Sequence, residues 1–446
     1  MYATNMNSLA MKPIRIGICA LLTFSVLAHG VVEPWSEAVL EIGAAILLAL
    51  WGWLWAFDIK PTLRWNWLLS PILGLWALAV VQYLTRTSAV PFLTEIEILK
   101  LSALGIIMFL AVQSFVTLEH WHGFVWFLLT LGFLISLFGV LQYFTFNGKL
   151  YWFREVRDSS IVFGPYVSRD HFAGLIELIA PVGLSILVLR AFPRDRVPLL
   201  AVLTVLPIGA LFLAASRGGI VAFSLEIAVL SGLVFVLDRS REQIFAGAAI
   251  LLLAAALVAW LGPRRALERF ASSRHLEVSE ARRIEMMKDS WRIFVDHPVI
   301  GTGLGTLREV FPQYETLYDG LTVNHSHNDY LEALAETGLV GGICGFAFLT
   351  VLFRGAQIRL AKAKSATDLA FHIGAFTACC GLLAHSFVDF NLHLPANALL
   401  FLVQATLATS ENQLSVRPAE PVNSPVADYT RETPKGGTFR PHLKEM

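Results

Sequence analysis

Long apolar runs without charged residues recur along the chain, and they limit its possible folds more than any other feature. Residues 244–262 hold one of them, with the core AGAAILLLAAALVAW. Runs of about 18 or more apolar residues are long enough to cross a bilayer as a helix. Over the whole chain 56% of residues are hydrophobic and 15% are charged, whereas about 25% are charged in a typical soluble domain. The sequence therefore predicts an all-α polytopic membrane protein and excludes a soluble enzyme with a large core.

Length and hydropathy together predict about twelve transmembrane helices. They lie near residues 14–32, 37–57, 66–84, 97–116, 121–144, 170–190, 197–215, 218–237, 244–262, 338–358, 367–387 and 394–410.

Basic residues predict how these helices are oriented, because cytoplasmic loops carry an excess of Lys and Arg. Four loops carry such residues: Lys60 and Arg64; Arg190, Arg194 and Arg196; Arg239 and Arg241; and Arg354, Arg359, Lys362 and Lys364. Counting spans from the N-terminus places all four on one side. We expect both termini on that cytoplasmic side and the remaining long loops on the external side.

The same pattern divides the chain into three parts. Residues 1–150 are predicted to be N-terminal transmembrane helices, and 151–410 a membrane domain with a long external loop at 263–337. The tail at 411–446 is rich in Pro, Ser, Thr and charge, so we expect it to be disordered. Formal net charge is zero, so no general attraction to nucleic acid is expected.

A dense polar cluster precedes one of the predicted spans, in NHSHNDYLEALAETGLVGG at 324–342. Asn324 or Ser326 is expected to cap a helix over 328–337 that ends at Gly338. His327 would then lie at a helix N-terminus, where the dipole disfavours the protonated ring. A neutral imidazole at this position can take a proton from a hydroxyl nucleophile.

Two other interpretations of this cluster remain open. The pattern His325-x-His327-x-Asp329 could bind a divalent metal, because imidazole and carboxylate are good ligands. The cluster could also be only a polar helix start at the membrane interface.

Arginines beside the apolar spans suggest an anionic partner. Arg217 lies in AASRGG between two spans, and a forked guanidinium there suits phosphate oxygens. Arg282 and Arg283 begin a predicted helix in the external loop, which is basic against the usual charge rule. A snorkelling or solvated arginine is the alternative at each position.

The predicted loop helix, SEARRIEMMKDSWRIFVDH at 279–297, has a helical period of apolar residues. Its apolar side chains are expected to gather on one side: Ile284, Met287, Trp291, Ile293, Phe294 and Val295. Two further polar groups lie at span ends, namely Arg169, Asp170 and His171, and then His385, Asp389, Asn391 and His393.

Residues 325–341 resemble the signature of the O-antigen ligase and polymerase superfamily, of the Wzy C-terminal domain type. The signature is His327, Asn328, nine residues, Gly338, two residues and Gly341. The segments SRGG, GPYVSRDHFAGL and RRIEMMKDSWRIFVDHPVIGTGLGTLREVFPQY are similar to family segments in the expected order. One departure is Met287, where the family often has Trp four residues after the Arg, so the choice between Arg282 and Arg283 stays open. The resemblance covers about 160–410.

The resemblance implies a C-type glycosyltransferase fold with a large helical periplasmic loop in the bacterial inner membrane. It implies transfer of a glycan from undecaprenyl diphosphate to a hydroxyl acceptor, lipid A core or another glycan, without a metal or other cofactor. His327 is then the base, and Arg217 and Arg283 bind the diphosphate. Arg282, Arg169, His325 and Asp329 complete the expected substrate site.

Other functions stay open at this stage. A polymerase of the same superfamily would use the same donor and the same base. A transporter of lipid-linked sugars or a metal-dependent hydrolase belongs to a different class, and mid-membrane polar groups or chelator sensitivity would point to them.

Overall fold

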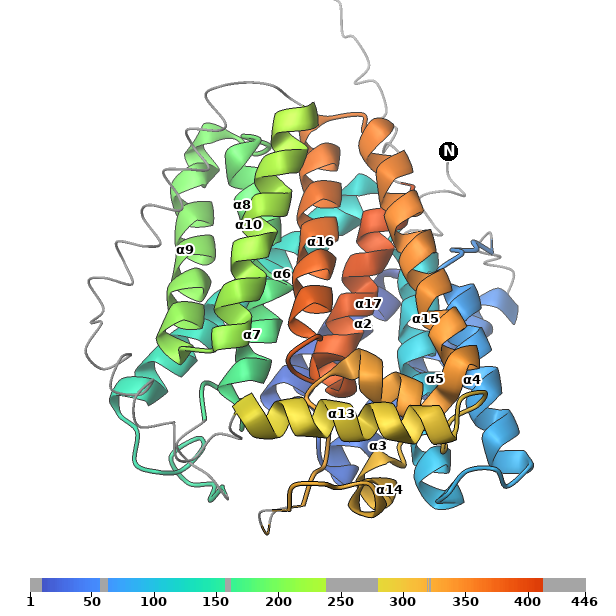
Figure 1. Ribbon diagram of the computed structural model, residues 1–446. Helices are drawn as coiled ribbons and strands as arrows, with labels where there is room; N and C mark the ends of the chain where they lie inside the picture. Colours follow the sequence, from blue (N-terminus) through green and yellow to red (C-terminus); the bar gives the residue numbers. More distant parts are fainter. Residues whose placement is uncertain are drawn as a thin grey trace, which may run out of the picture.

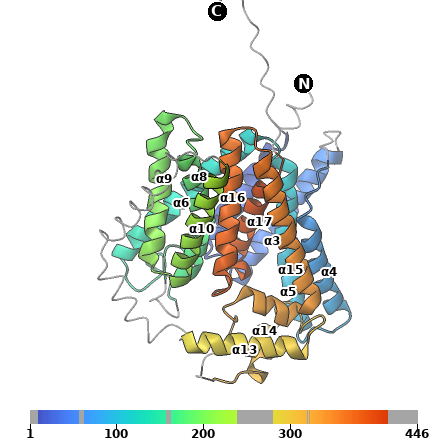
Figure 2. The same cartoon turned by 45° about the horizontal axis from the view of Figure 1, so that its top comes forward.

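The protein is a helical bundle with a smaller helical layer across one end (Figures 1 and 2). The computed structural model describes residues 10–56, 63–156, 162–237, 280–318, 320 and 322–411. Within these residues the only β-structure is two isolated bridges. Helix α13 (Glu280–Asp296) lies across the lower end of the bundle in both views, and we call this the α13 end.

The bundle is built from twelve helices of the described residues. They are α2 (Lys12–Leu27), α3 (Pro34–Ala56), α4 (Leu69–Leu84), α5 (Pro91–Ser114), α6 (Leu118–Phe144), α7 (Arg169–Glu177), α8 (Ala180–Val188), α9 (Val197–Ala214), α10 (Arg217–Leu237), α15 (Asp329–Ala361), α16 (Ala366–His385) and α17 (Pro395–Thr409). Short pieces join them: η2 (Arg194–Arg196), α14 (Leu307–Val310), η4 (Phe311–Gln313) and η5 (Asn391–His393).

Several of these helices can cross a membrane by length and composition. Seven candidates occur among the described residues: Pro34–Ala56, Leu118–Phe144, Arg169–Val188, Arg194–Ala214, Arg217–Leu237, Asp329–Ala361 and Ala366–His385. Leu69–Leu84 and Pro395–Thr409 are shorter apolar helices. The fold is therefore that of a polytopic helical membrane protein, as the sequence predicts.

Every predicted span inside the described residues coincides with a helix or helix pair. The total of twelve stays a prediction, because the span at 244–262 lies outside the described residues, as do 263–279 of the long loop and 412–446 of the tail.

The predicted span at 170–190 is broken into two helices, α7 and α8. Pro181 lies at the start of α8, where it lacks an N–H for the preceding turn. At this break the N–H of Val182 donates to the carbonyl of Ile179, so the carbonyl of Leu178 must find another donor inside the membrane. Gln404 of α17 donates to the carbonyl of Leu178 at 2.6 Å. These helices and α16 are among the most enclosed parts of the bundle.

The basic loops lie together at the end of the bundle opposite α13. Asn66 donates to Thr409 at 2.9 Å, and Arg359 donates to the carbonyl of the same Thr409 at 3.1 Å. Thr367 donates to the carbonyl of Ala191, which joins a third basic loop to this group. The loop of Arg239 and Arg241 lies outside the described residues. The grouping matches the predicted charge asymmetry, and which side is cytoplasmic stays a prediction.

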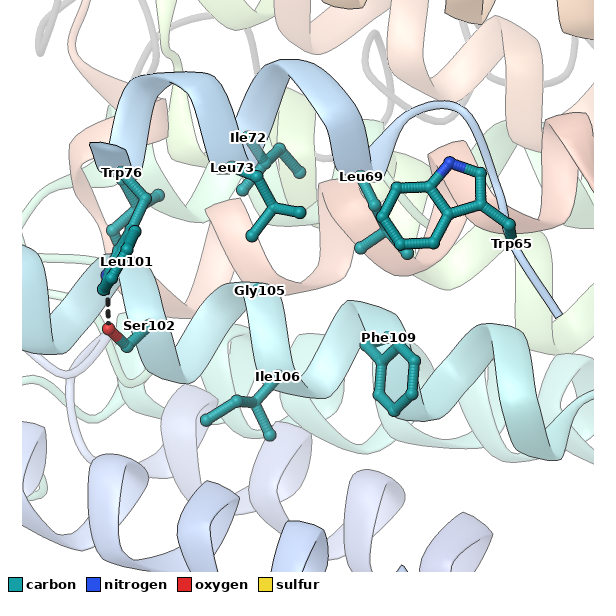
Figure 3. Close-up of a pocket in the computed structure, with 10 residues that line it drawn as sticks. All are labelled: Trp65, Leu69, Ile72, Leu73, Trp76, Leu101, Ser102, Gly105, Ile106 and Phe109. Carbon is teal, nitrogen blue, oxygen red and sulfur yellow. Dashed lines mark hydrogen bonds between the residues drawn. The ribbon is translucent and has the colours of Figure 1, made fainter. Parts of the chain in front are cut away.

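An apolar groove of about 330 Å³ lies between α4 and α5 (Figure 3). Trp65, Leu69 and Ile72 of α4 and its approach line one wall, and Gly105 and Phe109 of α5 line the other. The indole N–H of Trp76 donates to the hydroxyl of Ser102 at 2.8 Å, so both polar atoms are paired. Such a lining suits contact with lipid chains. None of the predicted site residues lines it.

Candidate active site

His327 lies two residues before α15, next to the N-cap of this helix, and the local sequence fixes its position. Asn328 is the N-cap, because its side chain accepts hydrogen bonds from the N–H groups of Tyr330 and Leu331. The expected cap at Asn324 or Ser326 was wrong by a few residues. His327 has a left-handed φ of +52°, which is uncommon for a residue with a side chain.

The ring of His327 pairs with Asp389, in the turn between α16 and α17. Nδ1 lies 3.3 Å from Oδ1 of Asp389. Because a carboxylate only accepts, Nδ1 carries the proton and Nε2 is left as the basic atom. The His327 side chain is 18% exposed and that of Asp389 is 4% exposed. A mostly buried imidazole is thus oriented by a buried carboxylate.

Asp389 also contacts a second histidine and accepts a hydrogen bond from an amide. Its Oδ2 lies 3.6 Å from Nε2 of His171 and accepts from the amide of Asn391 at 3.3 Å. Burial alone would raise the pKa of the Asp389 carboxyl. The neighbouring His171, His327 and His385 lower this pKa by more than burial raises it, so the net pKa lies well below its usual value. Asp389 is therefore charged at neutral pH and can stabilise a protonated His327.

Phe390 lies among three histidines of this end. The His325 ring stacks on it with centroids 4.2 Å apart, while His327 and His171 approach edge-on at 5.1 and 4.7 Å. Phe390 therefore packs against all three imidazoles.

His325 and Asp329 belong to a neighbouring cluster rather than to the His327–Asp389 pair. Nδ1 of His325 lies 2.7 Å from Oε1 of Glu332, and Nε2 of His393 lies 3.3 Å from the same oxygen. Nδ1 of His393 lies 2.6 Å from Oδ1 of Asp329. Burial lowers the pKa of His393, but Glu332 and Asp329 raise it more, to about 10. Asp329 thus ties the start of α15 to η5.

The two adjacent arginines of α13 have different surroundings. Arg282 is 5% exposed, pairs with Glu315 at 3.0 Å and donates to the carbonyl of Leu317. Arg283 is partly exposed and reaches toward Asp170 at the start of α7, with Nη2 and Oδ2 3.9 Å apart. Arg283 therefore faces the bundle, whereas Arg282 holds α13 to its own loop.

The apolar residues of α13 do not share one face. Ile284, Trp291 and Val295 are about half exposed, whereas Met286 and Ile293 are buried. The prediction that Ile293 clusters with Trp291 was wrong, because two positions apart on a helix point about 200° apart. Ile293 instead shares its face with Met286, two turns earlier.

Arg169 and Arg217 begin two helices at the α13 end. Arg169 opens α7 and is 3% exposed. Arg217 opens α10 and its side chain is exposed. A Cβ placed on the adjacent Gly218 would meet Nε2 of His385 and Val388. Arg217 therefore lies beside the turn that carries Asp389.

The glycines near the motif allow a close contact between α15 and the Gly-rich segment that follows α13. Gly338 breaks α15 with φ +60° and ψ −159°, as the predicted helix end requires. A Cβ there would meet the backbone of Val299, and one on Gly301 would meet the backbone of Glu336. Glu336 accepts from the N–H groups of Gly305 and Leu307, both at 2.8 Å. The Gly-rich segment at 298–305 is thereby locked onto the helix that His327 precedes.

Several polar residues of this end do not stand out from the sequence. Glu332 reads as one acid on a helix, although its spacing from Asp329 places both on one face. Glu177 and Glu226 lie inside long apolar stretches. Glu177 pairs with His385 at 2.9 Å, and Glu226 is 1% exposed near the middle of α10. A lone acid in an apolar run was the available signal.

The comparisons with known proteins give one family. Residues 202–346 match the Wzy_C family model, described as O-antigen ligase. The match covers about a third of the chain and confirms the resemblance over that part, which holds Arg217, α13, His327 and Gly338. It supports a function like that of an O-antigen ligase or polymerase. No curated protein matches the chain.

Proposed function

We propose that this membrane protein transfers a glycan from undecaprenyl diphosphate to a hydroxyl acceptor at the periplasmic face of the bacterial inner membrane. The pairing of His327 with buried Asp389, at the end of the bundle where Arg217 and Arg283 lie, carries the proposal. A base, its orienting carboxylate and two cations are the groups that this reaction needs.

Transfer replaces one carbon–oxygen bond with another. The acceptor oxygen bonds to the anomeric carbon that carries the diphosphate, and the bond from that carbon to the diphosphate oxygen breaks. The lipid diphosphate leaves with the electron pair, and the hydroxyl proton passes to Nε2 of His327. Asp389 stabilises the imidazolium that forms, since it accepts from Nδ1.

The leaving diphosphate develops negative charge, and arginine can neutralise it in place of a metal. Arg217 is exposed beside the Asp389 turn, and Arg283 reaches α7 from α13. Arg282 is less suited to this task because it is committed to Glu315. Arg169, at the start of α7, would support the position of Asp170 and Arg283 rather than meet the donor first.

Charge supports the orientation. The loops of Arg64, Arg190 and Arg359 group at the end opposite α13, which suits the cytoplasm. The α13 end, with His327, would then face the periplasm, where lipid-linked glycans are joined to lipid A core or to each other.

The test is a transfer assay with purified protein in lipid nanodiscs. It contains a lipid-diphosphate-linked glycan, lipid A core as one acceptor, the lipid-linked glycan itself as another, and excess chelator. We compare the wild type with His327→Ala, Arg217→Ala and His297→Ala. His297 is an exposed histidine that ends the α13 segment, so it serves as the matched control.

We expect transfer in the wild type and His297→Ala, none in His327→Ala, and a raised KM for the donor in Arg217→Ala. Sugar on lipid A core would identify a ligase, and longer chains on the carrier a polymerase. If His327→Ala equals the wild type at matched protein level, the proposal fails. Movement of the donor across the bilayer without a new glycosidic bond would instead identify a transporter.

A further inference from the structure

Two histidines and a glutamate converge at one point beside His327, and their arrangement is that of a metal site. His325 precedes α15, Glu332 lies in its first turn and His393 ends η5. One nitrogen of each ring and a carboxylate oxygen lie within 4.8 Å of one another. We propose that His325, Glu332 and His393 bind one divalent transition-metal ion, with zinc as the best match.

The distances suit a small ion. Two ligand atoms bound to tetrahedral zinc at about 2.0–2.1 Å lie roughly 3.3 Å apart. Nε2 of His393 lies 3.3 Å from Oε1 of Glu332, and Nδ1 of His325 lies 2.7 Å from it. A small outward movement of the His325 ring would admit the ion. Two imidazoles favour zinc and its neighbours, whereas magnesium and calcium prefer oxygen ligands.

The outer partners of the three ligands are also those of a metal site. A ligating histidine usually donates its other N–H to a carboxylate or carbonyl, and this fixes the ring. Nδ1 of His393 has such a partner in Asp329 Oδ1, at 2.6 Å. The second oxygen of Glu332 accepts from the N–H and the hydroxyl of Ser326, at 2.8 and 3.2 Å. Oε1 is thereby left to face the two rings.

The three proposed ligands differ in how far they are buried. The side chain of Glu332 is 2% exposed, whereas those of His325 and His393 are 32% and 25% exposed. A buried carboxylate with two partly open imidazoles leaves a path for an ion and a fourth position for water. His327 is outside this group, since its Nδ1 pairs with Asp389.

The ion would join three segments, namely the loop before α15, α15 itself and η5. His325 is two residues before His327, whose left-handed backbone needs support from its surroundings. The inferred role is therefore to stabilise the loop that carries the base, not to act on the reacting atoms, so transfer persists at a lower rate in excess chelator. This role rests on the proposed function, whereas ion binding does not.

The experiment measures binding without donor or acceptor. Purified full-length protein in nanodiscs is stripped with chelator, dialysed and titrated with Co²⁺, whose visible absorption reports tetrahedral coordination. Zn²⁺ then competes for the site. The variants are His393→Gln, His325→Gln, Glu332→Gln and Asp329→Asn, with His327→Gln and the exposed His297→Gln as controls. Circular dichroism and gel filtration verify that each variant is folded.

We expect the wild type, His327→Gln and His297→Gln to bind one Co²⁺ that Zn²⁺ displaces, and Zn²⁺ to raise their unfolding temperature. Asp329→Asn should lose roughly 10- to 100-fold in affinity, as is usual for an outer partner. The three ligand variants should lose more. Absence of binding in the wild type, or unchanged binding in folded His393→Gln and His325→Gln, would overturn the proposal and leave a hydrogen-bonded cluster only.

Discussion

Replacement of Asp389 by asparagine tests the proposed base more finely than removal of the histidine. The variant keeps the shape of the side chain and its hydrogen bond with Asn391 can re-form, but the negative charge beside His327 is lost. Nδ1 and Oδ1 are 3.3 Å apart, which is long for a hydrogen bond of this kind. A hydrogen bond to a charged group contributes about 1.5–3 kcal/mol.

This contribution gives the expected rate. It applies mainly when His327 is protonated, so its loss raises the barrier and not the energy of the bound donor. About 1.4 kcal/mol changes a rate tenfold, so kcat should fall by roughly 10- to 150-fold with little change in the donor KM. His327→Ala should lose more, on the order of 100- to 10,000-fold, as for removal of a general base.

Asp368→Asn is the matched control. Asp368 lies near the other end of α16, is 6% exposed, and its Oδ1 is 3.4 Å from Nε2 of His372. The same substitution there removes a similar buried pair far from His327, and kcat should stay within about twofold. Initial rates at saturating donor in nanodiscs give both values. A folded Asp389→Asn protein that turns over like the wild type would refute the pairing of Asp389 with the base.

Three further predictions follow from the same contacts. Arg283→Ala should raise the donor KM about tenfold or more, whereas Arg282→Ala should chiefly lower the unfolding temperature because it leaves the partly buried Glu315 without its partner. Equal donor KM values in the two variants would contradict this division. Gly338→Ala should destabilise the fold by about 1–3 kcal/mol, because its φ is +60° and a Cβ meets the backbone of Val299, while Gly345→Ala, with open space at its Cβ, should not; thermal unfolding of both variants measures the difference. The lowered pKa of Asp389 should stabilise the fold at pH values above about 4, the ordinary carboxyl range, and this stability should vanish as pH falls through the folded-state pKa. The gap in unfolding temperature between the wild type and Asp389→Asn should thus be constant near neutral pH and shrink in acid, and a gap that grows in acid would reverse the assigned sign.

The bundle could be predicted from the sequence because its signal is local. A helix that crosses a membrane must be long, apolar and internally hydrogen-bonded, so each span can be recognised from about 20 consecutive residues. The break between α7 and α8 is different. Pro181 gives a local hint, but the donor that satisfies Leu178 is Gln404, from a helix near the other end of the chain.

The candidate site likewise has a part that the sequence predicts and a part that depends on contacts between distant segments. His327, Gly338 and Gly341 form one short pattern, and the expected helix end at Gly338 is confirmed. Asp389 was visible only as part of a polar turn, because nothing in the sequence states that the turn folds back onto His327. The sequence does not distinguish the adjacent Arg282 and Arg283. Only the packing of α13 in the structure shows that Arg282 pairs with Glu315 and that Arg283 reaches Asp170.

The spacing of the motif connects these two halves. Nine helical residues separate Asn328 from Gly338, a rise of about 13–15 Å, with the cap at one end and the kink at the other. The cap fixes the loop of His327, and the kink admits the Gly-rich segment after α13, through Leu339 N–H to Pro298 and Val340 N–H to Val299. One added residue would turn the two ends by about 100° relative to each other. The motif therefore sets both the orientation of His327 and the position of the segment that follows α13, the helix of Arg283.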